Sequence, residues 1–263
     1  MKRLLHIILM MLLAAIVVII LGFIEKKQKS VRIREIKITI DHNNSESFIT
    51  NNDILSLINN EYDSVIGRFM SELSLEELNQ IIQNIPYSKK VDVYTTINGT
   101  LHVRIQQRQP RVRVINNNGK GCYIDADGYL MPLHPQKAAR VIIANGNLTD
   151  PLNDVTSLKI GIKHNELEER DLSDLEKVYL LVNCINNDKF LKAQIEQIFI
   201  NGSKEFELVP KVGSHIIHFG KINDMEKKFW KLKIFYTKIL EQEGWEKYKI
   251  INLKYANQIV CSK

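Results

Sequence analysis

The chain begins with a long hydrophobic run, because residues 7–24 are apolar throughout and carry no charge. At about 1.5 Å of rise per residue, roughly 20 such residues in a helix cross the hydrocarbon core of a bilayer. A cleavable signal peptide has a shorter apolar region that ends in small residues, whereas Ala14 and Ala15 lie in the middle of this run. The pattern therefore predicts an uncleaved transmembrane signal anchor over residues 4–24.

The flanks of this run bear on the orientation of the anchor. Lys2 and Arg3 precede it, and three lysines at positions 26, 27 and 29 follow it, so basic residues lie on both sides. Large domains translocate largely regardless of such charges, and export of the C-terminal part is the commoner outcome behind so short a tail. We expect residues 1–3 to be a cytoplasmic tail and the chain after the anchor to be extracytoplasmic.

The stretch after the anchor predicts a small α+β module. A strand-like alternation of apolar and polar residues comes first, with one slip in its period. Residues 50–60 then place apolar side chains at helical spacing, with Thr50 or Asn51 as the N-cap. A second helix opens at the capping box formed by Ser74 and Glu77 and stops at Pro86.

Two further alternating runs follow on either side of Asn98-Gly99, a strong hairpin signal because both turn positions need a positive φ. The predicted strands of this module are residues 31–41, 91–97 and 100–106. The order strand, helix, helix, strand, strand predicts helices on one face of a three-stranded sheet.

The rest of the chain predicts a larger mixed β domain with a helix near its C-terminal end. Capping boxes of Ser173 with Glu176 and of Asn223 with Glu226 open two helices, and Gly244 closes the second. Hairpin turns are predicted at Asp127-Gly128 and Asn201-Gly202-Ser203, and residues 147–169 are predicted as a loop. The predicted strands lie at residues 111–115, 141–144, 195–200, 206–209, 212–219, 248–253 and 255–261, and residues 123–130 are predicted as a hairpin.

Composition adds few constraints. The net charge of +6 becomes +4 once Lys2 and Arg3 are set aside, and the charges are interspersed along the chain, so no nucleic-acid footprint is indicated. Cys122, Cys184 and Cys261 are odd in number and lack C-x-x-C spacing, which argues against a domain built on disulfides or zinc. One bridge and buried free thiols both remain open.

Candidate catalytic and metal-binding patterns are weak. His215 and His218 stand three apart on a predicted strand, where their side chains point to opposite faces and do not share one ion. Asp125 to Gly128 resembles the start of a calcium loop, but the downstream glutamate is missing and a hairpin turn accounts for it better. The sequence contains no G-x-S-x-G, Ser-x-x-Lys or H-E-x-x-H pattern. We therefore predict a binding protein with no catalytic site, cofactor or metal.

The order of these elements and several short motifs resemble the FtsQ/DivIB cell-division proteins. In the first module the matching stretches are residues 85–86, 91–94, 98–99, 101–105 and 109–110. In the second they are Tyr123-Ile124-Asp125 with Gly128, the strand ending at Phe219-Gly220, and residues 251–255 with the sequence INLKY. Family members usually carry an acidic and a basic residue before the proline at 110, where this chain has Arg108 and Gln109. The resemblance covers nearly the whole chain after the anchor.

The resemblance implies a POTRA module over residues 31–108, a β domain over residues 109–263, and a non-catalytic scaffold of the bacterial divisome in the inner membrane at the septum. It also implies partners, namely small coiled-coil proteins of the FtsB and FtsL type, which pair with the last strands by β-strand addition. The residues of this chain that fall there are Leu253, Tyr255, Gln258, Ile259 and Val260, with Tyr255 as the principal aromatic anchor.

Two other readings of the sequence are kept as alternatives. POTRA modules also occur in envelope assembly and secretion factors, but those need many additional amphipathic strands, and this chain is short and carries helices instead. An anchored envelope enzyme needs a convergent set of acid, base and nucleophile, which the motifs do not supply.

Overall fold

The structure is a computed structural model that describes residues 10–16, 31–43, 46–152 and 172–263. Residues 10–16 are helical, but most of the predicted anchor and most of the predicted loop at 147–169 lie outside the described residues. Within those described ranges, no helix combines the length and the hydrophobicity needed to cross a membrane. Contacts divide the chain into two compact units: unit 1 reaches Gln107, and unit 2 comprises Arg108–Lys263 together with Asn44–Glu46.

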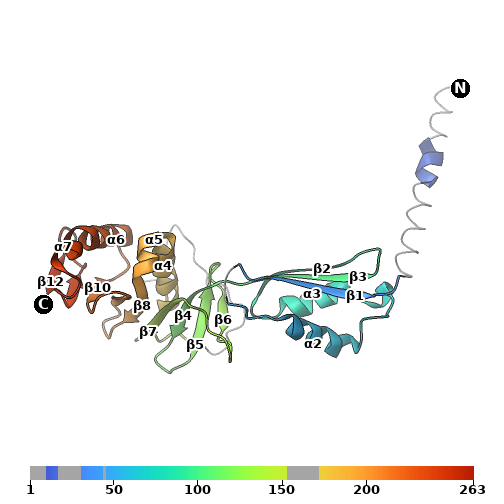
Figure 1. The fold of residues 1–263 in the computed structure, drawn as a ribbon, viewed down its shortest axis with the longest axis horizontal. Coiled ribbons are helices and arrows are strands. Elements are labelled where there is room, and N and C mark those ends of the chain that lie inside the picture. Colours follow the sequence, from blue (N-terminus) through green and yellow to red (C-terminus); the bar gives the residue numbers. More distant parts are fainter. Residues whose placement is uncertain (1–9, 17–30, 44–45, 153–171) are drawn as a thin grey trace. The chain divides into compact units, whose positions relative to one another are not determined.

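Unit 1 is a three-stranded sheet with two helices on one face (Figure 1). The strand order is β1-β3-β2, with β1 parallel and β2 antiparallel to the central β3. Its elements are β1 (Glu35–Asp41), α2 (Asn51–Tyr62), the 3-10 turn η1 (Met70–Glu72), α3 (Leu75–Gln83), β2 (Ser88–Thr95) and β3 (Thr100–Gln107). The predicted strand, helix, helix, strand, strand order is confirmed, although the first strand begins at Glu35 and not at residue 31.

Caps and apolar faces hold these helices against the sheet. Thr50, one of the two residues predicted as the N-cap, caps α2 through a complete capping box with Asp53. Ser74 caps α3 by accepting from the Glu77 amide, while the Glu77 carboxylate accepts a hydrogen bond from the Tyr62 hydroxyl at 3.0 Å. The side chains that the two helices and β3 bury together are Ile54, Ile58, Leu78, Ile82, Leu101, Val103 and Ile105.

The hairpin between β2 and β3 forms at the predicted place but not with the predicted turn. Its loop is four residues long, and Gly99 has a φ of +93° while Asn98 does not have a positive φ. The Asn98 side chain instead accepts from the Thr100 amide at 3.3 Å, and the Gly99 amide donates to the Thr96 carbonyl at 2.9 Å. Asn98 therefore stabilises a longer turn through its side chain, and only Gly99 supplies the left-handed backbone.

Unit 2 is built on a nine-stranded mixed sheet of order β12-β11-β10-β9-β8-β7-β4-β5-β6. Its strands are β4 (Pro110–Ile115), β5 (Gly121–Asp125), β6 (Leu130–Pro132), β7 (Ile142–Gly146), β8 (Ile195–Ile200), β9 (Phe206–Pro210), β10 (Ile216–Gly220), β11 (Ile250–Asn252) and β12 (Val260–Ser262). Its helices are α4 (Asp174–Asn187), α5 (Lys189–Gln194), α6 (Met225–Ile234), the π-helical segment η3 (Phe235–Leu240) and α7 (Glu241–Glu243). Mixed α+β architecture with a larger β domain is thus confirmed.

The helices of unit 2 bury apolar side chains against the sheet in a single core (Figure 1). Ser173 opens α4 with the predicted capping box to Glu176. The cap of α6 was predicted wrongly: Asp224 occupies the N-cap with a φ of +51° and no capping hydrogen bond, and the Asn223 side chain accepts from the Lys228 ammonium at 3.2 Å. Local spacing suggested a cap at Asn223, but the Lys228 ammonium, five residues ahead in α6, engages that side chain.

Candidate partner-binding edge

The last strand of the chain, β12, lies at one end of the nine-stranded sheet. It pairs with β11 in antiparallel register, Cys261 opposite Ile251 and Val260 opposite Asn252. In the part of the chain that the structure describes, no strand pairs with its other side. About half of the backbone donors and acceptors of β12 therefore face away from β11, and such an edge accepts a further strand. With three residues, β12 is shorter than the strand predicted over residues 255–261.

The predicted contact residues divide into exposed and buried groups. Tyr255 is 50% exposed, Val260 is 43% exposed, and Gln258 is also on the surface. Ile259 is half-buried and packs on the core of unit 2, and Leu253 is fully buried in that core. The structure thus brings Tyr255, Gln258 and Val260 to the surface next to the open edge. Leu253 positions the segment from beneath.

The segment between β11 and β12 is held by α6. The Lys231 ammonium donates to the backbone carbonyls of Leu253 and Tyr255, and burial lowers the pKa of this lysine. The Leu253 amide donates to the His218 carbonyl at 2.9 Å, which extends the ladder between β10 and β11. These contacts fix the backbone of Leu253 and of Tyr255, on both sides of residue 254. The position of Tyr255 beside the end of β11 is therefore fixed.

A buried aromatic cluster supports β10 from behind. His215 precedes β10, is 1% exposed, and shares a 2.6 Å hydrogen bond with the Tyr236 hydroxyl. Tyr236 lies in the π-helical segment η3, and its ring centroid is 5.3 Å from that of Trp245. Burial raises the pKa of Tyr236, so its hydroxyl stays protonated at neutral pH. The cluster connects η3 to the start of β10, which lies two strands from β12 in the sheet.

His215 makes the stability of unit 2 depend on pH. Burial lowers the pKa of its imidazole from 6.5, while the Glu246 carboxylate and the Trp245 backbone act in the opposite direction. Near pH 6.5 the imidazole is therefore protonated in the unfolded chain but not in the folded chain. Because the unfolded state binds more protons, we expect the unfolding free energy to decrease as the pH falls through 6.5 toward the folded-state pKa. Urea unfolding followed by tryptophan fluorescence at pH values of about 7.5 and 5.5 measures this.

The matched variants for this measurement are His215→Phe and His218→Gln. We expect His215→Phe to remove most of the decrease over this pH range, while His218→Gln retains it because His218 is only half-buried on β10. If both variants keep the decrease of the parent chain, His215 is not its source.

The other candidate chemistries have structural partners of their own. One oxygen of the Asp125 carboxylate accepts from the Asp127 and Tyr129 amides at 2.9 and 2.8 Å, and the other pairs with Arg108, so this loop is a hairpin turn. Across the described residues, no three His, Cys, Asp or Glu side chains are grouped as metal ligands. His215 and His218 lie in the two different environments given above.

The cysteines are unbridged in the described structure. Cys122 is fully buried, and burial raises the pKa of its thiol to about 12. Burial also raises the pKa of Cys184 and of Cys261, which are half-buried. Of the two alternatives that the sequence left open, the structure has free thiols, and Cys261 on β12 stands at the candidate edge.

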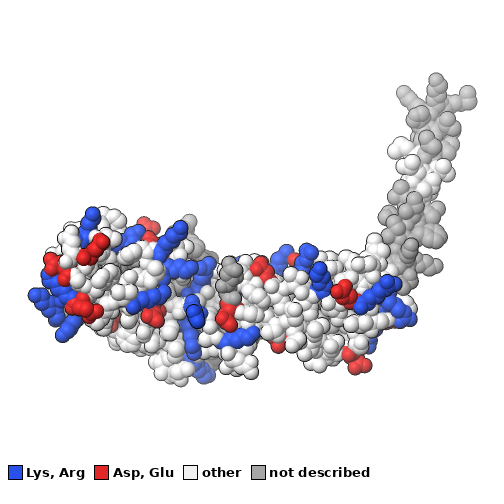
Figure 2. Space-filling view, viewed as in Figure 1, with Lys and Arg blue, Asp and Glu red and all other residues white. Residues whose placement is uncertain are grey.

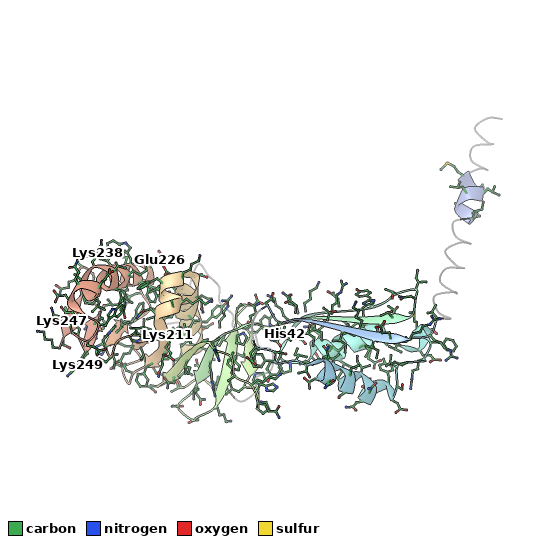
Figure 3. All side chains as sticks on the ribbon, viewed as in Figure 1. His42, Lys211, Glu226, Lys238, Lys247 and Lys249 are labelled. Carbon is green, nitrogen blue, oxygen red and sulfur yellow. The ribbon has the colours of Figure 1, made fainter. Side chains whose placement is uncertain are left out.

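Sequence reasoning missed Lys231 as the residue that holds the segment before β12. No local signal identifies it, because its partners lie more than 20 positions away and are backbone atoms. It also missed the basic character of this end of unit 2, where Lys247 and Lys249 lie near β11 (Figure 3). A count of charges by region would have shown this basic character, because residues 221–263 hold ten lysines and five acidic residues, a net charge of +5.

Fold and edge together define the class of this protein: a POTRA-like domain followed by a mixed β domain that ends in an open edge strand. A family model described as a POTRA-like domain matches residues 32–106. A second, described as FtsQ/DivIB, C-terminal related, matches residues 109–262, which is more than half of the chain. The chain therefore belongs to the FtsQ/DivIB C-terminal related family of cell-division proteins, and the resemblance seen in the sequence is confirmed.

One curated relative supports the same assignment. The chain is 26% identical over 180 residues to the cell division protein FtsQ of Rhodothermus marinus. The matched region covers 66% of this chain and 60% of that protein, so the chain spans about three fifths of the relative's length.

Proposed function

We propose that this chain is a non-catalytic, membrane-anchored scaffold of the bacterial divisome that binds a partner by strand addition at β12 and links early and late division proteins at the septum. The observation that carries the proposal is that one side of β12 pairs with none of the described strands, in a chain of the FtsQ/DivIB family. In strand addition, main-chain hydrogen bonds supply affinity and pockets for alternate side chains supply specificity.

The proposed partners are coiled-coil division proteins of the FtsB and FtsL type. Tyr255, Gln258 and Val260 contact the added segment, and Ile259 and Leu253 keep β12 and its approach in place. Tyr255 is the main anchor, since an exposed aromatic ring with a polar tip buries a large area on binding at little cost in side-chain entropy.

Charge favours an acidic partner segment. The net charge of +5 over residues 221–263 accounts for most of the chain's +6. Lys254 pairs with Glu205 and Lys247 with Glu243, while Lys249 flanks β11 and is exposed. Complementary charge raises the association rate and selects the partner more than it raises affinity.

The membrane part of the proposal rests on the apolar run. Residues 4–24 form the anchor, residues 1–3 lie in the cytoplasm, and the domains at 31–108 and 109–263 are extracytoplasmic, at the inner membrane and the division septum. In this arrangement the POTRA-like domain recruits the chain to the septum and contacts other divisome proteins. Family membership and the uncharged run at residues 7–24 support it.

The alternatives are a POTRA-bearing assembly or secretion factor and an anchored envelope enzyme. The match of residues 109–262 to the FtsQ/DivIB family favours a division protein over the first. Against the second, the carboxylate of Asp125 and the imidazole of His215 are both engaged in buried contacts that support the fold.

Photocrosslinking in cells from positions 255 and 260 tests the proposal. We expect both positions to trap one small, single-pass coiled-coil protein, because both side chains are exposed beside the open edge. A crosslinker at Asn118, exposed at the turn between β4 and β5, is the matched control and should not trap it. Capture of outer-membrane or soluble envelope proteins from 255 and 260 would contradict the scaffold proposal.

A further inference from the structure

Unit 2 contains a cavity of about 800 Å³ that is separate from the β12 edge. It lies where β4, β7 and β8 begin, next to α5 and the end of β9. Five basic side chains line it: Arg111, Arg113, Arg140, Lys192 and Lys211. The acidic side chains on its wall are Glu46 and Glu196, so the lining carries an excess of three positive charges. Figure 2 shows Lys and Arg side chains gathered on unit 2 in the neighbourhood of α5.

Two of the cations come from one strand. Arg111 and Arg113 alternate along β4 with Val112 and Val114, which are fully buried. Side chains two apart on a strand project from the same face, so the two guanidinium groups leave β4 on the side away from the core. Two planar forks on one face match ligands that accept paired hydrogen bonds, which are phosphates and carboxylates.

The lysines come from two elements that the fold joins. Lys211 follows β9, and its ammonium donates to the Lys192 carbonyl on α5 at 3.4 Å. The Lys211 amide donates to the Gln194 carbonyl at 2.7 Å, so the backbone ties the end of β9 to α5, and both lysines line the cavity. Among the described residues, none of the five cations forms an ion pair that would offset this charge.

Two buried donors on the cavity wall have no hydrogen-bond partner among the described atoms: Arg113 Nε and Asn186 Nδ2. A buried donor without a partner costs free energy comparable to a lost hydrogen bond, more when it is charged. Each of these atoms exposes less than 1 Å², so both lie behind the cavity surface and not on it.

We propose that this cavity binds a small polyanion whose charged groups are phosphates or carboxylates. Its volume lies in the range of about 300–1,000 Å³ that is typical of small-molecule sites. The excess of three positive charges calls for a ligand with at least two negative groups.

Isothermal titration of the full chain in a neutral detergent with sodium pyrophosphate, and separately with citrate, tests this and distinguishes the two chemistries. We expect saturable binding of one molecule per chain for at least one of the two anions. Saturation by pyrophosphate assigns phosphate, and saturation by citrate assigns carboxylate. The Arg113 Nε–H resonance in a ¹⁵N correlation spectrum should shift with the same saturation, which tests the site without any substitution.

Matched substitutions locate the binding. Arg111→Gln and Lys192→Gln are each expected to weaken it about tenfold, the effect of losing one charged hydrogen bond. Lys189→Gln, a lysine on the same helix that does not line the cavity, should change it less than about twofold. No saturable binding of either anion up to about 10 mM, or an equal loss in Lys189→Gln, overturns the proposal. Binding of an acidic peptide such as hexaglutamate without either small anion also overturns it, in favour of a protein-binding surface.

Discussion

The Asp125→Ala variant is expected to lose about 3–5 kcal/mol of the unfolding free energy of unit 2, because it leaves a buried charge without its partner. Asp125 is 1% exposed and accepts from the Arg108 guanidinium at 2.9 Å. That guanidinium lies 4.1 Å from the centre of the Tyr129 ring, with its side chain 8% exposed. The same carboxylate also closes the β5–β6 turn, so the substitution removes two kinds of contact at once.

Tryptophan fluorescence during urea unfolding measures this loss for unit 2 alone, because both tryptophans of the chain, Trp230 and Trp245, lie in that unit. The control is the double variant Arg108→Met/Asp125→Leu, which removes the charge pair and keeps apolar volume. Replacing a whole buried pair in this way is often nearly neutral, so the double variant should be clearly more stable than Asp125→Ala. A loss below about 1 kcal/mol in Asp125→Ala would show that water solvates Arg108 once its partner is gone.

The Tyr255→Ala variant is expected to weaken partner binding by about 30-fold, the loss typical of an aromatic anchor that contributes about 2 kcal/mol. The ring is 50% exposed, so its removal should leave the unfolding free energy of unit 2 unchanged within about 0.5 kcal/mol. The affinity is measured by titrating the purified full chain with the purified partner that the crosslinking experiment identifies. Ile259→Lys is a poorer choice, because Ile259 packs on the core and its replacement disturbs the fold.

Tyr94→Ala in unit 1 is the matched control for truncation of a tyrosine. Tyr94 stacks on His102 with ring centroids 4.8 Å apart and belongs to the other unit. We expect it to bind the partner with the affinity of the parent chain. An unchanged affinity in a folded Tyr255→Ala chain would remove Tyr255 from the proposed contact, although the main-chain pairing at β12 could still be tested by a proline at Val260.

Local chemistry explains the parts of the fold that the sequence predicted. Thr50, Ser74 and Ser173 cap helices because each hydroxyl reaches a backbone amide three residues ahead, which depends on nothing else in the chain. The hairpin at Gly99 forms because glycine tolerates a φ of +93°, and a β-carbon there would lie 2.5 Å from the Arg32 carbonyl oxygen.

Predictions failed where a lysine side chain competes for an oxygen of the predicted element. Asn223 accepts from Lys228 and leaves α6 uncapped by its side chain. The strand predicted over residues 255–261 shortens to Val260–Ser262, because the Lys231 ammonium holds the Tyr255 carbonyl and turns the chain away from the ladder. In both places a lysine ammonium on α6 donates to an oxygen that the local pattern predicted for a helix cap or a strand hydrogen bond.

The sequence by itself determined the order of elements in unit 1 and the α+β class, and its resemblance to the FtsQ/DivIB proteins indicated the family. The element order and the class rest on periodicity, capping and turn residues, which act over a few positions. Only the tertiary structure decided that Leu253 is buried while Tyr255 and Val260 are exposed, and that β12 is an edge. It also gathered into one cavity five cations that are interspersed from position 111 to position 211, because the order of strands in a sheet, and not their order in the chain, sets which charges become neighbours.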